Sequence, residues 1–115
     1  MKQDGRLTLG EDASDNGGLR IACKALAAAL KRQGKSLDDK DASGFTARQR
    51  FFLSHAYSWC SGQRPEVART VVVTNPHSLP ERRVNNVESN MPEFREAFGC
   101  KQGTGMVREK ACRVW

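Results

Sequence analysis

Apolar residues recur at helical spacing in the first third of the chain, over residues 9–33. The positions that share this face are Leu19, Ala22, Leu26, Ala29 and Leu30. This spacing predicts an amphipathic helix, and Gly34 is expected to end it. Inside the helix, Gly17 and Gly18 each cost about 1 kcal/mol relative to alanine, so we expect another backbone to approach closely there.

A second apolar segment follows a polar connection at residues 35–44. Thr46 and Gln49 have the spacing of a capping box, in which the two side chains satisfy backbone N–H groups at the start of a helix. The next residues on one side are Phe52, His55, Ala56 and Trp59. The sequence therefore predicts a second helix, strongly apolar on one face, that opens at Thr46 and ends before Gly62.

Proline and asparagine mark the boundaries in the second half of the chain. Pro65 suits the first position of a third helix over residues 65–72, and residues 74–80 are predicted to form a loop. Residues 81–90 are polar and are predicted to be irregular. Asn90 is expected to cap a short fourth helix, followed by a turn-rich tail over residues 99–115. The apolar residues of that fourth helix are Phe94, Ala97 and Phe98. No strand is predicted, so the fold class is mainly α.

Composition narrows the class of protein further. A chain of 115 residues with 38% hydrophobic residues and a mean hydropathy of −0.62 suits one small domain at most. Its 19 basic and 13 acidic residues give a net charge of +6, but the basic residues are scattered between acids, which argues against a nucleic-acid partner. No apolar stretch approaches the roughly 18–20 residues of a membrane span.

The four cysteines lie far apart and form no C-x-x-C pair, so a structural zinc site built from thiolates is not expected, while disulfides remain open. These cysteines are Cys23, Cys60, Cys100 and Cys112. For Cys23 we expect the role of a small buried hydrophobic residue.

Glu11 and Asp15 are the first candidates for chemistry, because their spacing places two carboxylates one turn apart on one helix face. Like charges so placed repel, so such a pair usually has something positive nearby. That can be a basic side chain, or a metal ion whose ligand needs a second carboxylate to orient it. The plainer alternative is a solvated helix start, where acids favour the helix dipole.

Six segments in one order give these carboxylates a context. The chain contains LGEDASDNGGLR at 9–20, FFLSHAYSWC at 51–60, NPHS at 75–78, RVN at 83–85, SNMPEFREAFGC at 89–100 and CRVW at 112–115. Together they resemble the C-terminal part of the neprilysin and endothelin-converting-enzyme family of zinc metallopeptidases, whose G-E-N-x-A-D-x-G-G motif is similar to the first segment. Several motifs in one order are a far stronger indication than one alone.

The resemblance implies a fold and a function. Residues 1–115 would be a C-terminal segment of a neprilysin-like catalytic domain, beginning inside that domain. The fold would be the mainly α C-terminal part of a thermolysin-like zincin catalytic lobe, incomplete as an independent domain. Apolar surface that the missing neighbours normally cover would then be open. We expect this of Phe51, Phe52, Trp59 and Phe98. Trp115 would dock into a groove of the parent domain.

The resemblance also implies residue roles in a zinc-dependent endopeptidase that hydrolyses oligopeptides. Glu11 would be the third, carboxylate ligand of the zinc ion, and Asp15 would accept a hydrogen bond from a ligating imidazole. His77 would donate to the oxyanion of the tetrahedral intermediate. Arg83 would bind a backbone carbonyl of the substrate. Its neighbour Arg82 is the competitor, but only Arg83 begins the RVN segment.

The family's zinc site also needs residues that this sequence does not contain. Its two histidine ligands and its general base come from an H-E-x-x-H helix, whereas the histidines here are His55 and His77, and no such motif is present. The family's upstream substrate-binding strand is absent as well, and Asp12 stands where the family often has asparagine. His55 is given no role, and is expected to be packed near Phe52 and Trp59 or partly exposed. We therefore expect the isolated chain neither to hold zinc tightly nor to cleave peptides.

The partners implied are a peptide substrate in the complete enzyme and an upstream half that carries H-E-x-x-H. The alternatives are a non-catalytic truncated fragment and a helical interaction module that pairs with a separately encoded half. Nucleic-acid binding rests on charge alone. Cys60, Cys100 and Cys112 resemble cysteines that form disulfides in the family. In the family, the partner cysteines of these disulfides generally lie upstream. Family members usually act outside the cytoplasm, but the sequence predicts no compartment for this chain.

Overall fold

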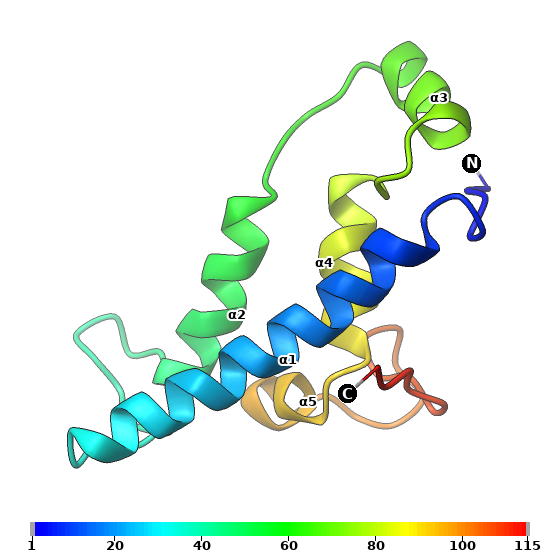
Figure 1. Ribbon diagram of the computed structural model, residues 1–115. Helices are drawn as coiled ribbons and strands as arrows, with labels where there is room; N and C mark the ends of the chain where they lie inside the picture. Colours follow the sequence, from blue (N-terminus) through cyan, green and yellow to red (C-terminus); the bar gives the residue numbers. More distant parts are fainter. Residues whose placement is uncertain (1, 115) are drawn as a thin grey trace.

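The computed structural model describes residues 2–114, and five α-helices lie in this range (Figure 1). They are α1 (Leu9–Arg32), α2 (Ala47–Ser58), α3 (Pro65–Thr74), α4 (Pro80–Ser89) and α5 (Pro92–Phe98). The β pairing within residues 2–114 is one isolated antiparallel bridge between Lys40 and Thr46. The mainly α fold class is thereby confirmed.

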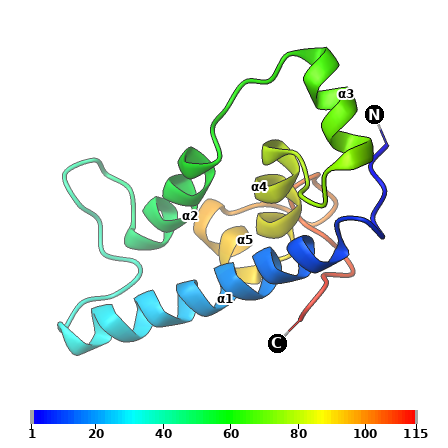
Figure 2. The ribbon, with the colours of Figure 1, turned by 45° about the horizontal axis from the view of Figure 1, so that its top comes forward.

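The helices form an open arrangement along α1. Figures 1 and 2 show α1 as the longest helix, with α4 crossing its N-terminal half and α5 beside its middle, while α3 stands apart from the other helices. The molecule measures 47 × 28 × 28 Å and its radius of gyration is 15.5 Å, against about 13 Å for a compact domain of this length. The fold is therefore elongated. None of the helices within the described residues is long and apolar enough to cross a membrane.

The apolar core is small and lies where α1, α2, α4 and α5 meet. Its buried members, from 1% to 8% exposed, are Leu19, Cys23, Phe52, Val87 and Met91. Phenylalanine rings extend it toward α5: Phe52 meets Phe94 edge to face at 5.3 Å, and Phe94 meets Phe98 at 4.9 Å. The expectation that Phe52 would be open is wrong because the ring is 1% exposed. Phe51, Trp59 and Phe98 are half-buried.

The predicted bounds of α1 are confirmed to within one residue, and Gly34 follows it with a positive φ of 68°. The predicted core face is only partly right, because Leu19 and Cys23 are buried while Ala22 is exposed. Further along the same face, Leu26 and Leu30 are half-buried and line a pocket together with Ala47 and Phe51 of α2. The close backbone approach expected at the glycine pair is wrong for Gly18, since a Cβ there would meet nothing within 4 Å.

The capping box at the start of α2 is confirmed. The backbone N–H of Gln49 donates to Thr46 Oγ1 at 3.1 Å, and the N–H of Thr46 donates to Gln49 Oε1 at 2.9 Å. The Nε2 of Gln49 also donates to the backbone carbonyl of Ala97 at 2.9 Å. This second contact fastens the start of α2 to the last turn of α5.

Two predictions for the second half of the chain are wrong. The segment predicted as irregular forms α4, which begins at Pro80 and turns Val87 and Glu88 inward. Because its inward face also carries charged side chains, its periodicity is hidden in the sequence. Asn90 follows α4 and does not cap α5, whose first residue is Pro92 and which has no side-chain cap. The third helix begins at Pro65 as predicted and runs two residues longer than expected.

The tail is held against the helices by polar side chains. The backbone N–H of Cys112 donates to Asn90 Oδ1 at 3.1 Å, and Asn90 Nδ2 donates to Asn16 Oδ1 at 2.9 Å. Arg108 donates from Nη2 to Asn86 Oδ1 at 2.9 Å. The tail is thus tied to α1 and α4. The docking predicted for Trp115 lies outside the described residues.

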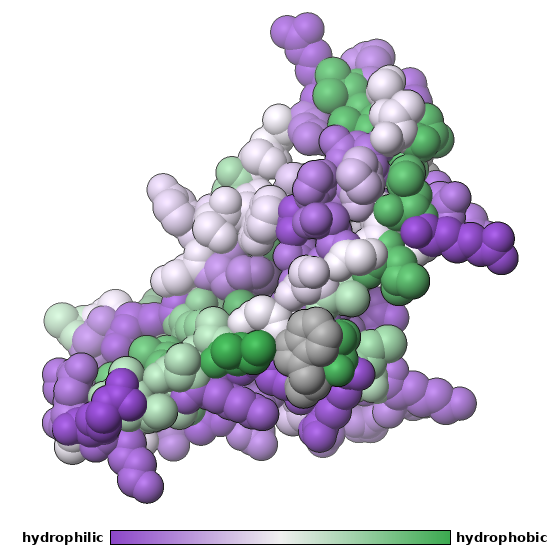
Figure 3. Space-filling model, viewed as in Figure 1, coloured by the Kyte–Doolittle hydropathy of each residue, from purple (hydrophilic) through white to green (hydrophobic). Residues whose placement is uncertain are grey.

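Exposed apolar side chains gather on α3. Val67 is 49% and Val73 69% exposed, while Val72 of the same helix is buried. Figure 3 shows hydrophobic atoms over this part of the molecule. Only one side of α3 is therefore covered by the rest of the chain.

Candidate functional site

The four residues that the sequence singles out lie together where the N-terminal turns of α1 meet α4. We call this group the polar end: Glu11, Asp15, His77 and Arg83. Glu11 and Asp15 come from α1, Arg83 from the first half of α4, and His77 from the loop between α3 and α4. The fold therefore joins residues separated by as many as 72 positions.

Arg83 is the centre of the polar end. Its Nε donates to Asp15 Oδ2 and its Nη2 to Asp15 Oδ1, both at 2.6 Å, which is a bidentate pair. The same Nη2 lies 3.3 Å from Glu11 Oε2. Hydrogen bonding to Asp15 raises the pKa of Arg83 above its usual value, against the opposing effect of burial. The guanidinium is thus a permanent cation between the two carboxylates.

This geometry explains how α1 tolerates two carboxylates one turn apart. The positive partner within this chain is a basic side chain, one of the two possibilities that the sequence leaves open. Arg83 is 11% exposed and Asp15 16% exposed, so their pair is largely shielded from water, whereas Glu11 is 40% exposed. Asp15 has both oxygens engaged, and Glu11 keeps one oxygen outside these contacts.

Trp59 makes a cation–π contact with Arg83. The carbon at the centre of the guanidinium lies 4.1 Å from the centre of the Trp59 ring. A cation over an aromatic face is attracted by the ring electrons. Trp59 directly follows α2, so this contact connects α2 to the polar end. Sequence reasoning placed Trp59 on the apolar face and missed this contact. The competitor Arg82 donates instead to Gln3 Oε1 at 3.3 Å.

His77 is oriented by its own loop and faces Glu11. Asn75 Oδ1 accepts the backbone N–H of His77 at 2.9 Å and lies 2.8 Å from the ring Nδ1. Because the amide oxygen can only accept, Nδ1 carries the proton. The other ring nitrogen, Nε2, lies 3.4 Å from Glu11 Oε2. Asparagine two residues before a loop histidine is an Asx-turn signal that sequence reasoning could have used.

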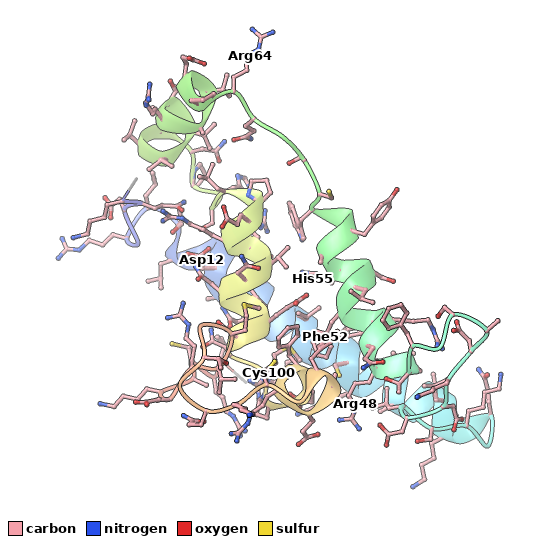
Figure 4. The ribbon with its side chains drawn as sticks, turned by 180° about the vertical axis from the view of Figure 1, so that it is seen from behind. Asp12, Arg48, Phe52, His55, Arg64 and Cys100 are labelled. Atoms are coloured by element: carbon pink, nitrogen blue, oxygen red, sulfur yellow. The ribbon has the colours of Figure 1, made fainter. Side chains whose placement is uncertain are left out.

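A second histidine pairs away from the polar end. His55 Nδ1 of α2 lies 3.0 Å from Glu88 Oε1 of α4, and their side chains are 16% and 5% exposed. Figure 4 shows His55 and Phe52 on the side of α2 that faces α4. The expectation that His55 packs near the apolar residues is consistent with this position. Its partner Glu88 was not foreseen, because it falls in the segment predicted as irregular.

No cysteine is bonded to another, and all four lie within the described residues. Cys60 and Cys112 are exposed and Cys100 is half-buried. Cys23 is buried in the apolar core as expected, and this burial, helped by the charge of Glu93, raises the pKa of its thiol.

The donor set for a zinc ion is incomplete in this chain. No group of three or more histidine, cysteine, aspartate or glutamate side chains that could hold a metal occurs within residues 2–114. At the polar end, His77 Nε2 lies 3.4 Å from the Glu11 carboxylate itself. A tetrahedral zinc site needs three or four protein ligands. The chain by itself does not fit the ion.

Comparison with known proteins gives one consistent answer. The model of Peptidase family M13 matches residues 1–114. Neprilysin-1 of Caenorhabditis elegans is 39% identical over 116 residues, which cover 100% of this chain and 15% of that protein. Endothelin-converting enzyme 1 of Bos taurus is 41% identical over 112 residues, or 97% of this chain and 15% of that protein. A solved structure, Haemonchus galactose containing glycoprotein complex, matches with a TM-score of 0.86 and 33% identity over 98% of this chain and 20% of that one.

Proposed function

Because this chain belongs to Peptidase family M13, a family of zinc metallopeptidases, we propose that it forms part of the active site of a zinc-dependent endopeptidase that cleaves oligopeptides. The chain spans about 15% of the length of the curated relatives that it matches. The complete activity therefore needs a further part of the enzyme, which carries the H-E-x-x-H helix.

One observation supports this proposal above the others. Four residues that the family motifs single out, at positions 11, 15, 77 and 83, contact one another through distances of 2.6 to 3.4 Å. A solvated helix start would leave Glu11 and Asp15 without distant partners. Instead, the fold gathers two carboxylates, an imidazole and a guanidinium at one place, which supports a shared role for these four residues.

We assign a distinct task to each of these residues of the polar end. Asp15 holds Arg83 through Nε and Nη2, so we assign the remaining nitrogen, Nη1, to a carbonyl of the substrate. Asn75 fixes the proton of His77 on Nδ1, so Nε2 donates to an oxyanion only when the ring carries a second proton. Such a donor can be worth about 2.7–4 kcal/mol in the transition state.

Glu11 is the zinc ligand that this chain would contribute. Its carboxylate is more exposed than that of Asp15, and the imidazoles needed to complete a site would have to come from the H-E-x-x-H part of the enzyme. The isolated chain is expected to retain no stoichiometric zinc after dialysis. Metal analysis together with a fluorogenic peptide assay measures this directly.

The decisive experiment is a chimaera. This chain replaces the matching segment of Neprilysin-1 from Caenorhabditis elegans, and turnover of a fluorogenic peptide is followed with and without a chelator. We expect chelator-sensitive turnover that is lost, together with zinc, in the Glu11→Gln chimaera. The exposed Glu81→Gln on α4 is the matched control. Zinc content and turnover that survive in Glu11→Gln contradict the proposal, and an inactive wild-type chimaera favours the alternative of a non-catalytic fragment.

A further inference from the structure

A third carboxylate, Asp12, lies beside the polar end, and the hydroxyl groups that it accepts come from neither Arg83 nor His77. Asp12 accepts two hydroxyl groups: Thr8 Oγ1 donates to its Oδ2 at 2.8 Å, and Ser78 Oγ donates to its Oδ1 at 2.6 Å. Thr8 is 1% and Ser78 6% exposed. We call these three residues the hydroxyl bridge. Figure 4 places Asp12 on α1 where α4 crosses it.

The bridge is not an ordinary helix cap. Thr8 stands at the position that precedes α1, where a threonine side chain usually accepts a backbone N–H of the first turn. Here it makes no such cap bond and donates to the Asp12 carboxylate instead. The other donor, Ser78, is 66 residues away in sequence and lies in the loop that carries His77. The bridge therefore serves a tertiary contact between α1 and that loop.

The positions of the bridge residues connect two members of the polar end. Asp12 directly follows Glu11, and Ser78 directly follows His77. The bond between Ser78 and Asp12 therefore fixes the two backbones within one residue of the groups that face each other at 3.4 Å. Asn75 cannot do this, because its bonds orient the His77 ring only relative to its own loop.

We propose that Asp12 is a positioning residue, which sets His77 Nε2 at its place over Glu11 through the hydroxyls of Thr8 and Ser78. This inference rests on the proposed function for its catalytic consequence, but its geometric part stands on this chain alone. A carboxylate suits the task because it accepts from both hydroxyls at once. An amide at position 12 would have to turn its NH2 group toward one of them.

The geometric part is tested on the full chain by NMR. The contact between the His77 ring and Glu11 is measured as a nuclear Overhauser effect, with the ring of His55 against Glu88 as an internal control. We expect Ser78→Ala and Thr8→Val to weaken the His77 contact severalfold and to leave the His55 contact unchanged. Thr8→Ser keeps the hydroxyl and is expected to preserve both contacts. Ser54→Ala, an exposed serine on α2, is the matched control.

The catalytic part is tested in the chimaera. Because small misplacements of a reacting group can lower rates by up to about 100-fold, Ser78→Ala and Thr8→Val are expected to lower kcat roughly 10- to 100-fold. KM should change less than about twofold, since His77 acts on the transition state. Thr8→Ser should keep the wild-type kcat, which a general loss of stability would not allow.

The geometric and the catalytic part of the proposal can be contradicted independently. If Ser78→Ala keeps the His77 contact, the positioning role is wrong whatever the chimaera does. If the wild-type chimaera is inactive, the proposed function fails, and the NMR result still decides whether the bridge positions His77. A Ser78→Ala chain that loses the His55 contact as well has unfolded, and the nearly isosteric Thr8→Val then decides by the same two contacts.

Discussion

The polar end and the apolar core are built from the same faces of the same two helices. On α1, Asp15 belongs to the polar end, and Leu19, one turn further, belongs to the core. On α4, Arg83 and Val87 are related in the same way. One turn of helix therefore separates a bidentate ion pair from a contact that excludes water.

The comparison teaches how the two regions divide their tasks. The core holds α1, α2, α4 and α5 together by burying apolar surface, which does not depend on direction. Ion pairs and hydrogen bonds at the polar end depend strongly on distance and angle, so they specify how α1 and the loop before α4 are placed relative to each other. Stability should therefore reside mainly in the core, whereas the polar end fixes the relative placement of its side chains.

The largest effect is expected from Phe52→Ala. The ring is 1% exposed and contacts Phe51 and Phe94, so its removal leaves a cavity that should cost about 3–5 kcal/mol of unfolding free energy. Tyr57→Ala on the same helix, where the side chain is 82% exposed, should change it by less than about 0.5 kcal/mol. Urea denaturation measures both, and equal midpoints would show that no cooperative core exists.

A smaller loss is expected at the polar end. Arg83→Ala removes charged hydrogen bonds to the largely buried Asp15, which should cost about 1.5–3 kcal/mol. Arg83→Lys should recover only part of this loss, because lysine cannot form the two-pronged pair. The exposed Arg69→Ala is the control for lost charge. If Arg83→Ala and Arg69→Ala unfold at the same urea concentration, the ion pair contributes nothing to stability.

The pair of His55 and Glu88 tests how polar groups beside the apolar core affect the free energy of unfolding. His55→Phe alone leaves the Glu88 carboxylate, 5% exposed, without this partner, at an expected cost of about 1–3 kcal/mol. His55→Phe with Glu88→Leu should regain most of that stability, since replacing both partners of a buried hydrogen bond by apolar residues can be nearly neutral. A double-mutant cycle gives the coupling energy, and strictly additive losses would mean that the two side chains do not interact.

The smallest effect concerns the thiol of Cys23. Burial raises its pKa in the folded state above the ordinary value of 9.0, so the unfolded chain loses this proton first as the pH rises. Stability from the neutral thiol is therefore complete below pH 9 and declines above it. At pH 8, alkylation followed by mass spectrometry should label the exposed Cys60 and Cys112 much faster than Cys23. Equal rates for all three would contradict a closed core.

The helices of the core could be predicted where apolar residues follow the helical period. The bounds of α1 and the capping box of α2 were predicted from Gly34, Thr46 and Gln49 because these signals act within a few residues of the chain. The burial pattern on α1 was harder, since it depends on which helices cover it. Ala22 has the right period and still faces water.

The candidate site residues were predicted from the family motifs, but their contacts with one another were not. Sequence reasoning named Arg83 as a substrate-binding residue and could not show that Asp15 holds it at 2.6 Å. It also missed α4 as a helix, because the inward side of this helix carries Arg83 and Glu88 in addition to valine. Partners 68 or more residues apart leave no local pattern, so these pairs become visible only in three dimensions.

Gln49 shows how one side chain can define two boundaries at once. Its carbonyl oxygen accepts at the beginning of α2, while its nitrogen donates to the carbonyl of Ala97 near the end of α5. Glutamate, which serves equally well in isolated capping boxes, has no hydrogen to give to Ala97. The amide at this position thus couples fraying of one helix to fraying of another almost fifty residues away. The capping box of α2 therefore also fixes the position of α5.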